Sequence, residues 1–362
     1  MNSTAISIVD LSAIKHNLQL IHAMLPRKKV MVMVKSNAYG HGLVRMTKAL
    51  TEVDALGVAT IAEAKQLREA GIDTDIVVMR GFATHDEMSI FLEDKRLIAC
   101  IHDDEQVCLL ERLQTPHSMR IWLKIDTGMH RLGVSADVFH HIYHRLNQLS
   151  CIQKEFVVCS HLADADNMDT TFTQKQIATF DALTNTLPNE KSILNSAGIL
   201  AHSDAAYDWV RPGLLLYGVS PFYYSGAHDV KMRDFIPAMT LESKIIAIKN
   251  VRAGEKIGYS CTYTAPHDMR IAIVGMGYGD SYPRQAQNGT PVLVQGQRCP
   301  IVGRVSMDMI TIDVSHLRQV AVEDTVTLWG RDLSVVEIAK WVNTISHELL
   351  CHLTGRVQRV YY

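Results

Sequence analysis

Short apolar runs alternate with amphipathic stretches over the first part of the chain. Runs of a few apolar residues, many of them β-branched, are typical of strands buried on both faces of a sheet. Between the runs, apolar residues recur at helical spacing, and we predict helices that begin at Asp10, at the capping box of Thr60 and Glu63, and at Ser135. The predicted strands are 30–34, 56–59, 76–79, 97–101, 121–125, 156–159, 192–194 and 214–217.

Strands that alternate with helices indicate parallel βαβ units. About eight strands within roughly the first 220 residues match a (β/α)8 barrel, and an open doubly wound sheet is the alternative. The barrel is favoured because polar residues follow most of the strands, and barrel active sites are assembled from the carboxyl ends of many strands. These polar residues are Lys35, Arg80, Lys124, His161, Ser196 and Arg211.

The pattern changes near Pro237. Beyond it, short strands separated by glycine turns predict a mainly β unit, with one helix at the capping box of Ser334 and Glu337. We therefore predict an α/β fold class, with a TIM-type (β/α)8 barrel over residues 1–236 followed by a mainly β C-terminal domain over residues 237–362. The strands predicted in this domain are 244–248, 270–274, 291–294, 309–314 and 325–329.

Lys35 ends the most apolar of the predicted strands, and the residues after it, 36–42, have the composition of a turn. Burial lowers the pKa of a lysine and makes its neutral, nucleophilic amine available near neutral pH, which is what a Schiff-base lysine requires. For an arbitrary lysine, the alternative of a surface side chain that leaves the end of a strand is the more common one.

Two further stretches have candidate chemistry. Residues 122–133 place Lys124 near the end of a strand and Arg131 shortly after it, although an ordinary surface ion pair would give the same pattern. Ser196, Arg211 and Gly213 offer a hydroxyl, a permanent cation and an approachable amide, which suit a phosphate near the last strands of a barrel, while loop caps are the equal alternative. The sequence predicts no metal site, because the histidine pair and the acidic loop that resemble one lack essential ligands.

Composition limits the partners and the compartment. The 362 residues carry a net charge of −2, with a pI of about 6.8, so we expect neither a nucleic-acid nor a membrane partner. The 7 cysteines are scattered and odd in number, which favours a reducing compartment without disulfides. With no apolar run of membrane-spanning length, the sequence predicts a soluble, cytoplasmic protein.

Taken together, the motifs closely resemble those of bacterial alanine racemases that use pyridoxal 5'-phosphate (PLP). The resemblance extends over essentially the whole chain and both predicted domains. It implies an isomerase that interconverts L-alanine and D-alanine and supplies D-alanine for peptidoglycan. The matching stretches, which follow one another in the order of that family, are 34–42, 124–131, 195–196, 211–213, 258–259 and 306–308.

The resemblance implies two bases. Lys35 would hold PLP as an aldimine and then exchange a proton on the D face of the substrate, and Tyr259 would exchange a proton on the L face. In this family the tyrosine comes from the partner subunit, so each active site would lie between two chains and a homodimer would be required for activity.

The resemblance also implies the contacts of the cofactor and the substrate. Arg211 would face the pyridine nitrogen of PLP, with His161 beside it. Arg131 would bind the PLP phenolate and the substrate carboxylate, and carbamylation of Lys124 would orient it. The residues implied for the PLP phosphate are Ser196, Tyr39, Gly213 and Leu214, and those implied near the substrate, besides Arg131, are Met307, Tyr278 and Asp308.

One departure from the family pattern concerns specificity. Gly355 occupies a place near the C-terminus where many members carry a tyrosine, so the first alternative is a broader amino-acid racemase that also accepts serine or lysine. A non-catalytic PLP carrier on the same barrel is a second alternative, but such proteins lack the β domain that carries Tyr259. A barrel-type PLP decarboxylase is a third, and it would require a different motif in that domain.

Overall fold

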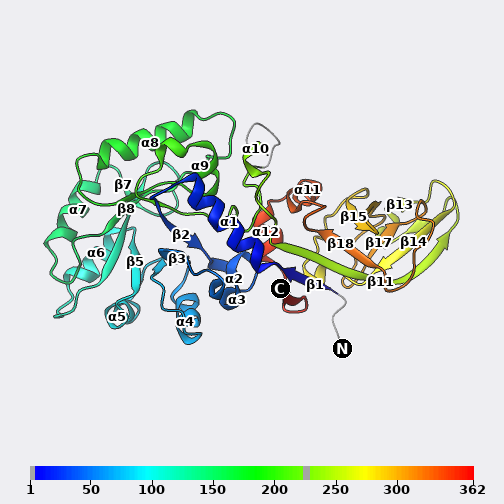
Figure 1. The fold of residues 1–362 in the computed structure, drawn as a ribbon, viewed down its shortest axis with the longest axis horizontal. Helices are drawn as coiled ribbons and strands as arrows, with labels where there is room; N and C mark the ends of the chain where they lie inside the picture. The colour runs from blue at the N-terminus through cyan, green and yellow to red at the C-terminus, as the bar shows by residue number, and fades with distance from the viewer. Residues whose placement is uncertain (1–4, 223–228) are drawn as a thin grey trace.

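The computed structural model describes residues 5–222 and 229–362. A closed barrel lies at one side of the molecule and a mainly β region at the other, with the long strand β11 (Met239–Val251) leading from the junction into the β region (Figure 1). This confirms the predicted fold class of a (β/α)8 barrel with a mainly β region after it.

The barrel sheet consists of parallel strands, and pairing of the first of them with the last and of β5 with β6 closes the ring. The predicted runs form these strands because their apolar side chains are buried both inside the barrel and under the surrounding helices. In order round the barrel the strands are β2 (Lys29–Met33), β3 (Ala55–Val58), β4 (Ile76–Val78), β5 (Leu97–Ile101), β6 (Arg120–Asp126), β8 (Val157–Cys159), β9 (Lys191–Ser192) and β10 (Trp209–Val210).

The eighth strand lies earlier than predicted. Residues 214–217 are buried, but they form tight turns in which the amides of Leu216 and Tyr217 donate to the carbonyls of Gly213 and Leu214. The strand is instead β10, directly before Arg211. A short buried apolar run has no periodicity that separates a strand from a compact turn, which explains the error.

Helices surround the barrel, and their caps decide where they begin. Asp10 accepts from the amides of Ser12 and Ala13, and Thr60 and Glu63 form the predicted capping box. The prediction at Ser135 was wrong, because Ser135 lies in β7 (Val134–Ser135). The barrel helices are α1 (Leu11–Met24), α3 (Leu43–Lys48), α4 (Ile61–Glu69), α5 (His85–Glu93), α6 (Asp104–Glu111), α7 (Phe139–Gln148), α8 (Thr171–Thr184) and α9 (Ser196–Ala201), with α10 (Asp229–Met232) before the β region.

The β region contains the predicted strands and both ends of the described chain. Strand β1 (Ile6–Val9) pairs with β11 and with the last strand, β19 (Gln358–Tyr361), so residues 6–9 belong to this sheet and not to the barrel. The other strands are β12 (Lys256–Ile257), β13 (Tyr263–Thr264), β14 (Met269–Val274), β15 (Pro291–Val294), β16 (Gln297–Pro300), β17 (Ile310–Asp313) and β18 (Thr325–Trp329).

Two short helices follow β18. Ser334 caps α11 (Val335–Trp341) as predicted, but the carboxylate of Glu337 pairs with Arg298 and does not complete a capping box. The next helix, α12 (Ser346–Cys351), packs against the segment after Lys35, where a side chain at Gly40 would collide with the carbonyl of Leu350. The β region thus reaches the barrel beside the residue that the sequence singles out.

Across the two described stretches of the chain, we find no helix with the length and apolarity that crossing a membrane requires.

Candidate functional site

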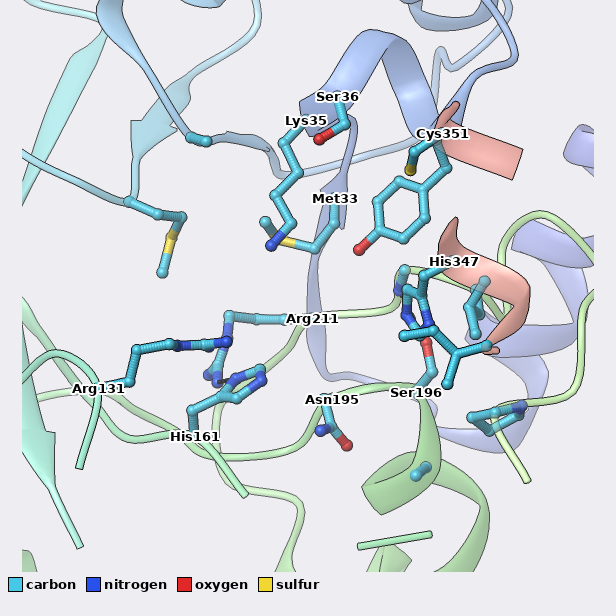
Figure 2. A pocket seen from close by; sticks show the side chains of 18 of the residues that line it. Met33, Lys35, Ser36, Arg131, His161, Asn195, Ser196, Arg211, His347 and Cys351 are labelled. Carbon is cyan, nitrogen blue, oxygen red and sulfur yellow. Dashed lines mark hydrogen bonds between the residues drawn. The ribbon is translucent and has the colours of Figure 1, made fainter. Parts of the chain in front are cut away.

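A cavity of about 630 Å³ opens at the carboxyl ends of the barrel strands, within the size range of small-molecule sites. Figure 2 shows the side chains of Lys35 and Arg131 directed into its central space, while the side chain of Arg211 runs toward His161. The residues that the sequence predicted and that line this cavity are Lys35, Tyr39, Arg80, Lys124, Arg131, His161, Ser196, Arg211, Gly213 and Leu214.

The backbone that follows Lys35 is unusual. Ser36, Asn37, Ala38 and Tyr39 all have positive φ, between 51° and 55°, and form a left-handed turn, α2 (Lys35–Tyr39). Each such non-glycine residue costs about 1–2 kcal/mol. The surroundings hold this conformation, because Glu63 accepts from the amide of Ser36 at 2.6 Å and the side chain of Asn37 accepts from the amide of Leu43 at 2.8 Å. Strain of this kind is typical of functional sites.

Cations gather in the cavity. Burial, followed by the charges of Arg131 and Lys124, lowers the pKa of Lys35 below its ordinary value. Burial also lowers the pKa of Lys124, and the charges of Arg211 and Arg131 act in the same direction. The pocket therefore favours a neutral, nucleophilic amine at Lys35 and attracts anionic groups.

Arg211 is buried at the base of this space. Its Nη2 donates to the carbonyl of Ser160 at 2.5 Å and lies 3.3 Å from Nδ1 of His161. Burial and the charge of Arg211 lower the pKa of His161 well below 6.5, so the imidazole is neutral and Nδ1 is free to accept this hydrogen bond. These contacts hold the guanidinium in place, and because arginine does not release its proton, the group is a permanent cation in a low-dielectric environment.

Hydroxyl groups and amides meet at another side of the cavity. The Oγ of Ser196 accepts from the amides of Gly213 and Leu215, at 2.8 and 3.2 Å. A Cβ at Gly213 would lie 2.6 Å from Oη of Tyr39, so only glycine leaves room there. Burial raises the pKa of Tyr39, which keeps its hydroxyl a hydrogen-bond donor. This group of donors suits a phosphate.

The predicted residues of the β region do not line this cavity. Tyr259 follows Gly258, whose φ is +76°, and the residue is 66% exposed on the β region. Met307 and Tyr278 are also exposed, and so is Asp308. Within one chain, the structure does not bring Lys35 and Tyr259 together.

Helix α12 supplies lining residues that sequence reasoning missed. His347, Cys351 and the preceding Ile345 line the cavity, and the ring centroid of His347 lies 5.8 Å from that of Tyr39. Burial in the pocket, followed by the charge of Lys35, lowers the pKa of His347 to about 4. No local motif marks these residues, because they reach the pocket only through the packing of α12 on α2.

Gly355, the departure from the family pattern, lies outside the cavity, and a Cβ placed on it would meet nothing within 4 Å. In this chain, residue 347 and not residue 355 contributes to the pocket wall near the C-terminus. Among the described residues, no cluster of three or more His, Cys, Asp or Glu side chains is placed to bind a metal ion.

Two family models match the chain. The model of the alanine racemase N-terminal domain matches residues 9–221, and that of the alanine racemase C-terminal domain matches residues 238–361. The chain belongs to the alanine racemase family. It is 50% identical over 356 residues to an alanine racemase of Coxiella burnetii, a match that covers 98% of each chain.

Solved alanine racemases have the same architecture. The biosynthetic alanine racemase of Pseudomonas aeruginosa superposes with a TM-score of 0.94 at 36% identity and covers 100% of both chains. The alanine racemase of Bartonella henselae, solved with covalently bound pyridoxal phosphate, superposes with a TM-score of 0.88 at 27% identity and covers 99% of both chains.

Proposed function

We propose that this chain is a PLP-dependent racemase that interconverts L-alanine and D-alanine in the cytoplasm and supplies D-alanine for peptidoglycan. The observation that carries the proposal is the convergence of Lys35, Arg211 and the donors around Ser196 in one cavity of a chain that matches both alanine racemase domains. The fold alone would leave the chemistry open, whereas this set of side chains matches the separate functional groups of PLP.

The residues present fit PLP. Lys35 offers an amine with a lowered pKa, and the hydroxyls of Ser196 and Tyr39 surround the space that Gly213 leaves open. Arg211 is buried and cannot take up or release a proton. An amine, a phosphate cradle and a fixed cation together match the aldehyde, the phosphate and the ring nitrogen of the cofactor. When bound, PLP supplies a ring that delocalises the negative charge left at Cα after loss of a proton.

Side chains of the protein then carry out the proton transfers at Cα of the substrate. Lys35 binds the cofactor, and its amine, once free, holds or returns a proton at Cα on the D face of the substrate. Arg211 would face the ring nitrogen of the cofactor and, as a guanidinium that does not release its proton, would leave that nitrogen unprotonated and favour return of the proton to Cα. The neutral His161, which accepts from Arg211, keeps the guanidinium in place.

The second base is proposed to come from a second copy of the chain. Tyr259 is exposed and lies outside the cavity of its own chain, so it is available to a partner. In a homodimer with two-fold symmetry, each β region would contribute Tyr259 to the other barrel. The side chain of Tyr259 would exchange the proton on the L face of the substrate. Tyr278, Met307 and Asp308 are exposed on the same region and would complete the substrate site.

Arg131 would bind the substrate carboxylate together with the amide of Met307, and it would also face the phenolate of the cofactor. Lys124 lines the same cavity with a lowered pKa, which leaves its amine open to carbamylation. The negative charge gained in this way would pair with Arg131 and hold it toward the substrate.

The test is to map the cofactor on the purified enzyme. We expect a PLP absorbance band, borohydride fixation of the cofactor on Lys35, and racemisation of alanine. Lys35→Ala should lose the label and the activity, and Lys175→Ala, a change on the exposed face of α8, should keep both. Absence of a PLP band in the wild type, or a label on another lysine, would refute the proposal. Equal turnover of serine would replace alanine specificity with the broader racemase.

A further inference from the structure

Two exposed loops of the β region are fastened to each other. The 277–282 loop carries Tyr278, and the 304–309 loop carries Met307 and Asp308. The amides of Tyr278 and Gly279 donate to the carbonyls of Ser306 and Met307, at 3.0 and 2.8 Å. The two loops therefore move as one unit unless these bonds break.

Arg356, from the segment that leads into β19, joins the same two loops through its side chain. Its Nε lies 3.0 Å from Oδ1 of Asp280, and its Nη2 donates to Oδ1 of Asp308 at 2.6 Å. Asp280 is 6% exposed, and its other oxygen accepts from the amide of Gly277 at 3.0 Å. A side chain at Gly279 would collide with the guanidinium.

The shape of arginine suits this position. Its planar fork reaches two carboxylates at once, whereas a lysine ammonium is a single point charge. Loss of Arg356 would leave the carboxylate of Asp280 buried with one backbone donor, and a buried charge without its partner is unfavourable. The 277–282 loop would then rearrange, together with the loop bonded to it.

We propose that Arg356 is a positioning residue that fixes Tyr278 and Met307 for the active site of the partner subunit. This inference rests on the proposed function, in which these loops complete the other chain's pocket. It adds a residue that touches neither substrate nor cofactor and acts through Asp280 and Asp308.

The same segment offers a matched control. Arg359, three residues further along, donates from Nε to the carbonyl of Gly40 at 2.7 Å, in the turn after Lys35 of its own chain. Arg359 is therefore expected to act on the pocket of its own barrel, while Arg356 acts on the partner's pocket. Mixed dimers separate the two cases.

The first measurement uses homodimers. Arg356→Gln should lower kcat/KM for alanine by about 10-fold to 100-fold, mainly through KM, because small displacements of positioning groups have effects of this size. The PLP band and the labelling of Lys35 should stay as in the wild type. Arg356→Lys should recover part of the loss. Wild-type KM in Arg356→Gln would overturn the inference.

The second measurement uses hybrid dimers, purified through two different affinity tags. One subunit carries Lys35→Ala, and the other subunit carries only the arginine substitution and keeps its Lys35. In the Arg356→Gln hybrid, the intact Lys35 faces the intact loops of the other chain, so we expect wild-type KM and about half of the wild-type activity per dimer, since one of two symmetric sites works. In the Arg359→Gln hybrid, the defect shares a barrel with the intact Lys35 and should persist.

A raised KM in the Arg356→Gln hybrid would show that Arg356 acts within its own chain. This result would overturn the inference but not the proposed function. The hybrid of wild type with Lys35→Ala serves as the reference. If that hybrid, or the wild-type enzyme itself, does not racemise alanine, the proposed function fails and the inference fails with it.

Discussion

At the scale of single residues, His41 shows how the fold constrains an ionisable group beside the site. Its side chain is fully buried, and Nδ1 donates to the carbonyl of Tyr39 at 2.9 Å. Nε2 is buried without a hydrogen-bond partner. Burial lowers the pKa of His41 to about 4, so the folded protein holds the ring neutral where the unfolded chain would protonate it.

This difference predicts a specific acid sensitivity. Between pH 6.5 and about 4 the unfolded state binds a proton that the folded state does not, so stability falls as the pH falls. The full difference corresponds to about 3 kcal/mol. We expect the unfolding free energy, measured by urea titration over this range, to fall less steeply in His41→Gln than in the wild type. Parallel curves for the two proteins would contradict the prediction.

The sequence predicted the place of some residues in the pocket but not of others. Lys35, Lys124 and Arg211 could be predicted to lie in one pocket, because each lies close to the carboxyl end of a barrel strand. His347 and Cys351 could not, because they reach the pocket from a helix of the β region. Gly355 was predicted to affect the substrate pocket because of its place in the sequence, but in the structure it does not contribute to the pocket wall.

At the scale of elements, the left-handed turn after Lys35 is the most strained segment of the site. The sequence predicted a turn there from its composition, but the hand of the turn depends on tertiary contacts such as that of Glu63 with the amide of Ser36. The same limit explains residues 214–217, where apolar character predicted burial correctly and the strand wrongly. Local pattern decides burial better than it decides backbone conformation.

Because Ser36 lies in this strained turn, substitution by glycine should change the unfolding free energy in opposite directions at Ser36 and at a serine in an ordinary helix. Ser36→Gly removes a left-handed non-glycine residue and should raise the unfolding free energy by about 1 kcal/mol, after allowing for the greater freedom of glycine in the unfolded chain. Ser89→Gly, in the right-handed helix α5, should lower it by about 0.5 kcal/mol, because glycine is a poorer helix former than serine by about this amount. Thermal and urea unfolding of the two variants, side by side, test this. A destabilised Ser36→Gly would show that the turn is not strained at this residue.

At the scale of the whole molecule, the separation of Tyr259 from the cavity makes the proposed mechanism depend on the quaternary structure. The sequence alone predicted this division only through the family resemblance, since no pattern within one chain tells which copy a side chain will serve. The structure supports the proposed division, because Tyr259 is exposed on the β region and lies outside the cavity of its own chain.

Activity should therefore depend on protein concentration. We expect racemisation per chain to decline on dilution as dimers separate, while PLP remains fixed on Lys35, because in the proposed dimer the cofactor residues come from one chain and Tyr259 from the other. Sedimentation at each concentration provides the dimer fraction for comparison. Constant activity per chain across a range in which dimers become monomers would contradict the shared site.

The pairing of β1 with β11 and β19 has a consequence for biosynthesis. On the ribosome, β1 emerges before the barrel, whereas both of its neighbours, β11 and β19, are translated only after the barrel. Strand β1 is therefore without these two partners while the barrel is being synthesised, and an open strand edge of this kind favours aggregation. Helix α12 is also translated late, so a nascent barrel has Lys35 in place before the wall that encloses it exists.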